Sequence, residues 1–356
     1  IENNIAMLGF YRATDHSKVK YNLVDQVIDD YNDATGIDAA NSTNEALSSG
    51  VYAGATVISP TGATSTDTSI SGYTTLVLSA GSGSVVIPNS ANVTMLVVGG
   101  GGAGAKTSGG GAGAGGLIYK ATHALTAQTY SWVRGAGGVG TASVGVAGNV
   151  GADSTWTDAS SNVEFTAKGG GGGGQQNTVA TNGGSGGGAG HDVDGARSAT
   201  QSSQSGDSGT YGFGFDGGQG TEADTYNTGG GGGAGSAGQS AAASYSGDGG
   251  TGKDYGAIFG TSVGDGGWFA SGGGGGYVVN VDGLVGHASA GGGGQGGANL
   301  SGGNSGQALT GGGAGGAGGQ GSGTTGSGGS GIILIRYAND AFTSPSDLTL
   351  QSTDST

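Results

Sequence analysis

The stretch Gly312-Gly-Ala-Gly-Gly-Ala-Gly-Gly-Gln320 carries the pattern that decides how this chain folds. Its non-glycine residues recur at every third position. The same spacing holds earlier in the chain, at Gln295, Ala298, Ser301, Asn304 and Gln307. A period of three is that of the polyproline II helix, which rises about 3.1 Å per residue and has three faces.

Glycine accounts for 91 of the 356 residues, in runs such as Gly169–Gly174. Only 33% of the residues are hydrophobic and 6% aromatic, so a side-chain core can be only small and local. A tract of this kind is either a flexible Gly/Ser linker or a set of backbones packed against each other. The period of three favours packing as polyglycine II helices, whose N–H and C=O groups find partners on neighbouring helices. Three prolines and no sustained Gly-X-Y frame exclude collagen.

Stretches rich in β-branched and aromatic residues lie on both sides of this tract and within it, separated by turn residues. Val93–Val98 and Ile332–Arg336 are continuous apolar runs, as is typical of strands covered on both faces. We predict a mainly β fold, with a small jelly-roll-like sandwich that carries a long inserted bundle of polyglycine II helices. The expected strands are Tyr73–Leu78, Ser84–Ile87, Val93–Val98, Leu117–Lys120, Tyr130–Val133, Val163–Ala167 and Ile332–Tyr337.

Composition divides the chain into four regions. Residues 49–98 form the first part of the sandwich, 99–331 the glycine-rich insertion, and 332–356 the closing strand and a polar tail. Residues 1–48 have ordinary composition and are expected to be an attachment or oligomerisation segment. They contain a short amphipathic helix that packs on its own neighbours or docks onto another protein, marked by Leu23, Val24, Val27, Ile28 and Tyr31.

Charge and composition exclude several classes of partner. Twenty-five acidic and 10 basic residues give a net charge of −15, which repels nucleic acid and anionic headgroups. No stretch approaches the roughly 18 apolar residues needed for a membrane span, so we expect no insertion into a membrane. The chain has no cysteine, and the segment that starts at Ile1 lacks the long apolar region of a signal peptide.

Residues suited to catalysis are scarce, so we expect no enzyme activity, cofactor or metal site. His16, His123, His191 and His287 show no metal-ligand spacing to one another. The sequence His191-Asp192-Val193-Asp194 offers ligand atoms, but a fourth ligand is missing and a polar loop explains it better. Calcium bound by aspartates of an isolated loop stays open.

Aromatic residues occur between the glycine runs of the tract. They cap the ends of the glycine helices in small clusters, or they form an exposed binding surface for sugars or a protein receptor. Tyr211, Phe213 and Phe215 alternate, which would place three rings on one face of an extended segment. The receptor-binding candidates are Tyr211, Phe213, Phe215, Tyr226, Tyr245, Tyr255, Trp268 and Phe269.

Two longer stretches, Met95-Leu-Val-Val-Gly-Gly-Gly-Gly-Ala-Gly104 and Gly328-Gly-Ser-Gly-Ile-Ile-Leu-Ile-Arg-Tyr337, resemble the glycine-rich domain of phage tail-fibre and other virion proteins. Asn4-Ile-Ala-Met-Leu-Gly-Phe-Tyr11 and Asp33-Ala-Thr-Gly-Ile-Asp-Ala39 are similar to the opening segment of structural proteins from marine bacteriophages. The resemblance implies packed polyglycine II helices that present variable loops to a bacterial surface.

From this resemblance we expect a structural protein on the virion surface. It would be a fibre or spike that binds a glycan or outer-membrane protein of the host and joins other virion proteins through residues 1–48. A homo-oligomer, a trimer by analogy with fibres, is expected. A non-adhesive subunit, such as a capsid decoration fibre or an extracellular filament protein, is the alternative, and a calcium- or carbohydrate-dependent matrix protein ranks last.

Overall fold

The computed structural model describes residues 59–60, 64–192, 195–201, 212–221, 226–278, 284–319 and 324–342. The chain separates into two compact units, one of residues 1–57 with 342–356 and the other of residues 58–341. The attachment segment and helix predicted within residues 1–48 lie outside the described residues. Everything below concerns the unit of residues 58–341.

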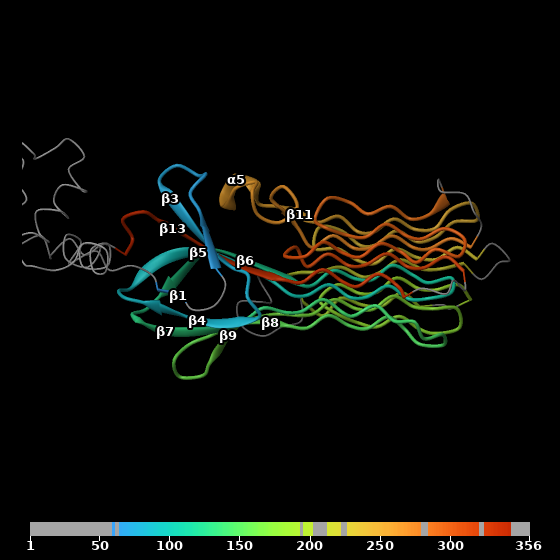
Figure 1. Ribbon diagram of the computed structural model, residues 1–356, viewed down its shortest axis with the longest axis horizontal. Coiled ribbons are helices and arrows are strands. Elements are labelled where there is room, and N and C mark those ends of the chain that lie inside the picture. The colour runs from blue at the N-terminus through green and yellow to red at the C-terminus, as the bar shows by residue number, and fades with distance from the viewer. Residues whose placement is uncertain are drawn as a thin grey trace, which may run out of the picture. The chain divides into compact units, whose positions relative to one another are not determined.

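Two antiparallel sheets form the β part of this unit (Figure 1). The five-stranded sheet has the order β1(Ser59–Pro60), β4(Ser82–Ile87), β7(Gln128–Val133), β8(Ser154–Thr157), β9(Val163–Ala167). The six-stranded sheet has the order β10(Gly212–Phe213), β6(Leu117–Leu125), β5(Ala91–Val98), β13(Ile332–Ala338), β3(Tyr73–Leu78), β2(Thr64–Asp67). The predicted mainly β fold is confirmed.

All the strands expected from the sequence are present. The last of them, β13, pairs with both β5 and β3, so strands on either side of the glycine tract close one sheet. The sequence prediction missed β8 and the short strands β1, β2, β10, β11 and β12. The four residues of β8, Ser-Thr-Trp-Thr, contain only one large apolar side chain.

Large aromatic side chains fill the core on the inner faces of the strands. Tyr130, Trp132, Trp156 and Phe165 are almost completely buried. The rings of Tyr130 and Trp156, from neighbouring strands of the five-stranded sheet, stack with their centroids 5.0 Å apart. Aromatic rings of this size contribute a large apolar area each, which suits a sandwich of short strands.

The other face of the six-stranded sheet is also covered. A segment that contains β11(Lys253–Asp254), α5(Gly256–Phe259) and β12(Trp268–Phe269) places Phe259 and Phe269 in one buried cluster with Leu96, Val98 and Leu334. Burial on both faces explains why the sequences of β5 and β13 are continuous apolar runs rather than alternating ones. The prediction of two covered faces is therefore confirmed.

The glycine-rich chain leaves and re-enters the sandwich at strand ends (Figure 1). β5 continues into residues 99–105, and residues 109–116 return to β6. Residues 135–140 follow β7 and residues 148–152 lead to β8. We call such stretches glycine segments; the other segments used below are residues 168–174, 229–234, 271–276, 291–297, 301–307, 311–318 and 326–331.

Backbone hydrogen bonds join each glycine segment to its neighbours with a period of three. In segment 311–318, Ala314 and Ala317 donate to Gly102 and Ala105 of one neighbour. The residues before them, Gly313 and Gly316, donate to residues 271 and 274 of a second neighbour, and those after them donate to residues 304 and 301 of a third. The three-residue repeat in the sequence thus corresponds to three directions of bonding.

Segment 99–105 is surrounded by other segments. Its N–H groups donate to segments 109–116, 148–152 and 326–331. Its carbonyl groups accept from segments 135–140, 168–174 and 311–318. Such an arrangement satisfies the backbone polar groups of a buried extended chain without forming a sheet.

Close approach of the backbones explains most of the glycines. A Cβ built at Gly101 would lie 2.1 Å from the Gly312 carbonyl oxygen. The packed segments nevertheless admit some alanine side chains. Ala103, Ala112 and Ala114 are completely buried within the packed segments, and their N–H groups keep bonds of 2.8–2.9 Å.

Candidate binding surface

Many of the turns that join the glycine segments lie at the end of the segments away from the sheets (Figure 1). Residues 106–108 join the segments that follow β5 and precede β6. Residues 141–147 do the same between β7 and β8. Further turns at this end contain residues 175–179, 242–245 and 298–300. Turns far apart in the sequence are thus gathered at one end, which we call the turn end.

Several non-glycine residues of the turn end have left-handed backbone conformations. Their φ angles are 53° at Thr107, 59° at Asn177, 56° at Asp192, 53° at Tyr226 and 51° at Asn299. Such conformations cost about 1–3 kcal/mol each and persist only where surrounding structure fixes them. Here the hydrogen bonds of the packed segments fix the turns, for example the 2.8 Å bond from the Asn299 N–H to the Tyr277 carbonyl.

His191 is the centre of one side-chain cluster at the turn end. Its buried ring lies against the half-exposed ring of Tyr226, with centroids 4.4 Å apart, and its Nδ1 is 2.9 Å from a carboxylate oxygen of Asp192. The His191 N–H donates to the Ser108 carbonyl at 3.3 Å, and its own carbonyl accepts from Asn177 at the same distance. The sequence motif at His191 and Asp192 therefore belongs to a turn that anchors an exposed tyrosine.

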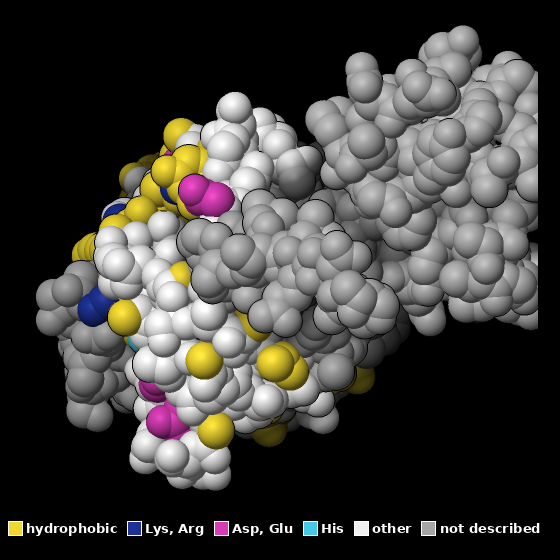
Figure 2. Space-filling model, turned by 90° about the vertical axis from the view of Figure 1, so that its left-hand side faces the viewer, with side chains coloured by type: hydrophobic (Ala, Val, Ile, Leu, Met, Phe, Trp, Pro, Cys, Tyr) yellow, Lys and Arg dark blue, Asp and Glu magenta, His cyan; other side chains and the backbone are white. Residues whose placement is uncertain are grey.

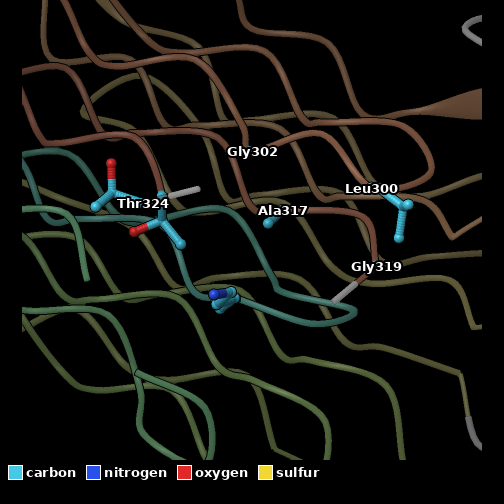
Figure 3. A pocket seen from close by; sticks show the side chains of 7 residues that line it. Leu300, Gly302, Ala317, Gly319 and Thr324 are labelled. Carbon is cyan, nitrogen blue, oxygen red and sulfur yellow. The ribbon is translucent and has the colours of Figure 1, made fainter. Parts of the chain in front are cut away.

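A pocket at the same end is too small for a ligand (Figure 3). It is lined by Lys106, Leu300, Ala317, Thr324 and Thr325 among others, and its volume is about 10 Å³. A cavity of that size holds about one water molecule. This pocket therefore offers no room for a ligand larger than water.

The structure divides the aromatic candidates between the two ends of the segments. Tyr226 and Tyr245 lie at the turn end, and each exposes 39% of its surface. The remaining described candidates lie beside the sandwich: Phe213 on β10, Phe215 just after it, Tyr255 before α5, and Trp268 and Phe269 on β12. Tyr211 lies outside the described residues. The candidates do not form one cluster.

Two of the candidates are core residues. Phe269 is completely buried, and Tyr255 is almost completely buried, with its ring stacked on Tyr119 at a centroid distance of 4.6 Å. Phe213 packs beside them and lies under the Lys253 ammonium, which is 3.9 Å from the ring centroid. For these residues the alternative of small packed clusters applies, because their rings cover the six-stranded sheet.

Burial also changes the ionisation of Tyr255. Desolvation, with a smaller contribution from Tyr119, raises the pKa of Tyr255 well above its ordinary value. The shift reflects packing in the apolar cluster. Because the phenol is enclosed and no catalytic partner contacts it, the shift does not indicate a reactive group.

The sandwich end carries few charges. Figure 2 shows that polar side chains and backbone cover much of the described surface there, with hydrophobic side chains scattered over it. Its ion pairs are local, Lys168 with Asp153 at 2.8 Å and His123 with Glu164 at 3.0 Å. Across the described ranges no group of three or more His, Cys, Asp or Glu side chains is arranged for a metal ion. In the same residues, no helix has the length and apolar character required to span a membrane.

The glycine-rich domain family matches residues 74–338, from the start of β3 to the end of β13. This match covers most of the chain, so the chain belongs to the glycine-rich domain family. A comparison with curated proteins found no match.

Proposed function

We propose that the chain is a virion structural protein, a fibre or spike whose glycine-rich domain displays the turn end to a host surface. In this proposal the glycine segments are polyglycine II helices. Residues 1–48 attach the chain to other virion proteins, and several copies, three by analogy with fibres, associate at the virion surface. The partner at the turn end is a glycan or an outer-membrane protein of the bacterial host.

The observation that carries the proposal is that many turns are gathered at one end of the hydrogen-bonded glycine segments. Thr107, Asn177, Tyr226 and Asn299 come from remote parts of the sequence, yet all lie at the turn end in fixed left-handed conformations. The glycine segments that hold these turns are joined to one another by backbone hydrogen bonds. A preorganised surface of this kind loses little conformational entropy on binding.

Substitution of the two exposed tyrosines at the turn end tests the proposal. We expect virions with Tyr226→Ala and Tyr245→Ala to assemble normally and to adsorb to host cells at least about tenfold more slowly, because exposed aromatic rings dominate such contacts. Tyr73→Ala is the matched control, since Tyr73 lies on β3 and exposes 38% of its surface. Its adsorption rate should equal that of the wild type.

Normal adsorption by the double variant would count against display and favour a non-adhesive subunit, such as a capsid decoration fibre or filament protein. One observation supports that alternative: among the described residues, Tyr226 and Tyr245 are the only strongly exposed aromatic side chains at the turn end. Imaging of the assembled particle separates the two functions. A fibre that is adhesive presents the turn end away from the particle, whereas a decoration lies along its surface.

A further inference from the structure

The hairpin formed by segments 135–140 and 148–152 differs from the rest of the glycine bundle. It exposes four valines, Val139 at 70%, Val144 at 58%, Val146 at 43% and Val150 at 53%. The other strongly exposed large apolar side chains of the described residues are spread over the sandwich and the remaining turns. A concentration of apolar side chains on one surface element marks an interaction site more often than isolated ones do.

This hairpin lies at an edge of the packed segments. Segment 135–140 bonds to segments 99–105, 148–152 and 326–331, and segment 148–152 bonds to segments 99–105, 135–140 and 168–174. Segment 99–105 has twice as many neighbouring segments. Within the described residues, the N–H groups of Gly137 and Val150 make no hydrogen bond. The hairpin is therefore the counterpart of an edge strand, with backbone groups available to a partner.

An open groove of about 400 Å³ runs between the two segments of the hairpin. Its floor is backbone, from Gly137, Gly138 and Gly151, and its sides carry Val139 and Val150. The surface thus combines a shallow groove with protruding valines of a size to enter such a groove. A surface that carries both features fits a second copy of itself, as an isologous interface requires.

Charge favours the same partner. The whole chain has a net charge of −15, but residues 135–152 contain no Asp, Glu, Lys, Arg or His. Copies of an acidic chain repel each other through most of their surfaces, and the repulsion is smallest where an uncharged face meets an uncharged face. Among the described residues, the one charge in hydrogen-bond contact with the hairpin is the Lys106 ammonium, which donates to the Ala142 carbonyl at its turn, away from the face that carries Val139 and Val150.

We propose that residues 135–152 form a self-association surface, on which the same hairpin of a second copy docks with its Val139 and Val150 against the groove. The interface buries the exposed valines and brings the unbonded N–H groups of each hairpin to carbonyl groups of the other. The inference goes beyond the display function and does not depend on it, because two copies can join through this face whether or not the turn end binds a host. The contact is two-fold and therefore separate from the association of three copies proposed by analogy with fibres.

The oligomeric state of the purified full-length chain tests this surface. We expect sedimentation equilibrium to show self-association of the wild type that strengthens with added salt, since salt screens repulsion between acidic copies. Val139→Asp with Val150→Asp should weaken the association at least about 100-fold, roughly tenfold for each substitution. Val163→Asp, on an equally exposed valine at the start of β9, should leave it unchanged.

Cysteine cross-linking gives a second measurement that does not depend on destabilising the interface. Because the chain has no cysteine, Val139→Cys introduces a single thiol within the proposed contact itself. Oxidation should convert most of this variant to a covalent dimer, and Val163→Cys to little of it. A monomeric wild type, an aspartate double variant that associates as tightly as the wild type, or equal cross-linking of the two cysteine variants would overturn the proposal.

Discussion

Replacing one central glycine by alanine should destabilise this protein far more than the same change at the surface. At Gly101 an added Cβ would lie 2.1 Å from the carbonyl oxygen and 2.5 Å from the carbonyl carbon of Gly312. Ordinary contacts of a Cβ begin at 3.4 Å, so segments 99–105 and 311–318 would have to separate by about 1.3 Å.

That separation breaks identifiable hydrogen bonds. The two segments are joined by the bonds from Ala314 to Gly102, at 3.1 Å, and from Ala317 to Ala105, at 2.9 Å. Both bonds would exceed 3.5 Å, and their groups are buried without access to water. A buried polar group left without a partner costs about 1–3 kcal/mol, so the two bonds together amount to roughly 2–6 kcal/mol.

Thermal unfolding of the full-length variants measures the effect. For a domain of this size, that loss lowers Tm by at least about 4 °C. The matched control is Gly81→Ala in the turn between β3 and β4, where a Cβ meets no atom within 4 Å and φ is not left-handed. There the change should stabilise by about 0.4–1 kcal/mol, because alanine reduces the entropy of the unfolded chain. If Gly101→Ala and Gly81→Ala melted at the same temperature, close backbone packing would not hold the segments together.

Two further predictions concern the cluster on the sheet and the packed segments. Burial raises the pKa of Tyr255 above its ordinary value of 10.0, so the neutral phenol stabilises the fold below pH 10 and this contribution is lost as the pH rises. Tyr255→Phe should therefore make Tm fall less steeply as the pH is raised above 10. An unchanged slope would show that the phenol is not enclosed. Amides of residues 109–116 and 313–318 should exchange hydrogen slowly, because each is bonded to another segment. The exposed amides of Ala142 and Val144, in the turn of the hairpin, should exchange quickly. Uniform fast exchange would rule out a packed bundle.

Strand positions could be predicted from the sequence because they depend on local pattern. Val93–Val98 and Ile332–Ile335 are long enough and apolar enough to require cover on both faces, and both are buried as expected. The three-residue period likewise predicted three bonding directions, since an extended glycine chain presents its N–H groups in three directions. The strand positions and the three bonding directions therefore follow from the local sequence.

The aromatic site could not be predicted in the same way, because its location depends on where each loop returns in space. Tyr255 and Phe269 occur in the glycine tract just as Tyr226 and Tyr245 do, and the sequence around them shows no period. A signal was nevertheless present. Continuous apolar strands need a cover, and the stretch from Tyr255 to Phe269, with Ile258, Phe259 and Val263 between them, is an apolar part of the tract that could supply it.

The sandwich also determines how the glycine segments align. Val98 pairs with Leu117 in the sheet, and just beyond it Gly99 donates to Gly116 and Gly102 to Gly113, which is the same register. β13 and β5 behave alike: Ile332 pairs with Val98, and the bonds from Gly101 to Gly329 and from Gly104 to Gly326 continue that register. Glycine segments carry few side chains that could distinguish one alignment from another, and an unspecified register slips easily. The apolar strands supply the missing specification, because a shift of one residue there would turn buried side chains such as Leu96 and Val97 to opposite faces. A chain with so little hydrophobic surface can therefore order a long bundle from a few strands at one end.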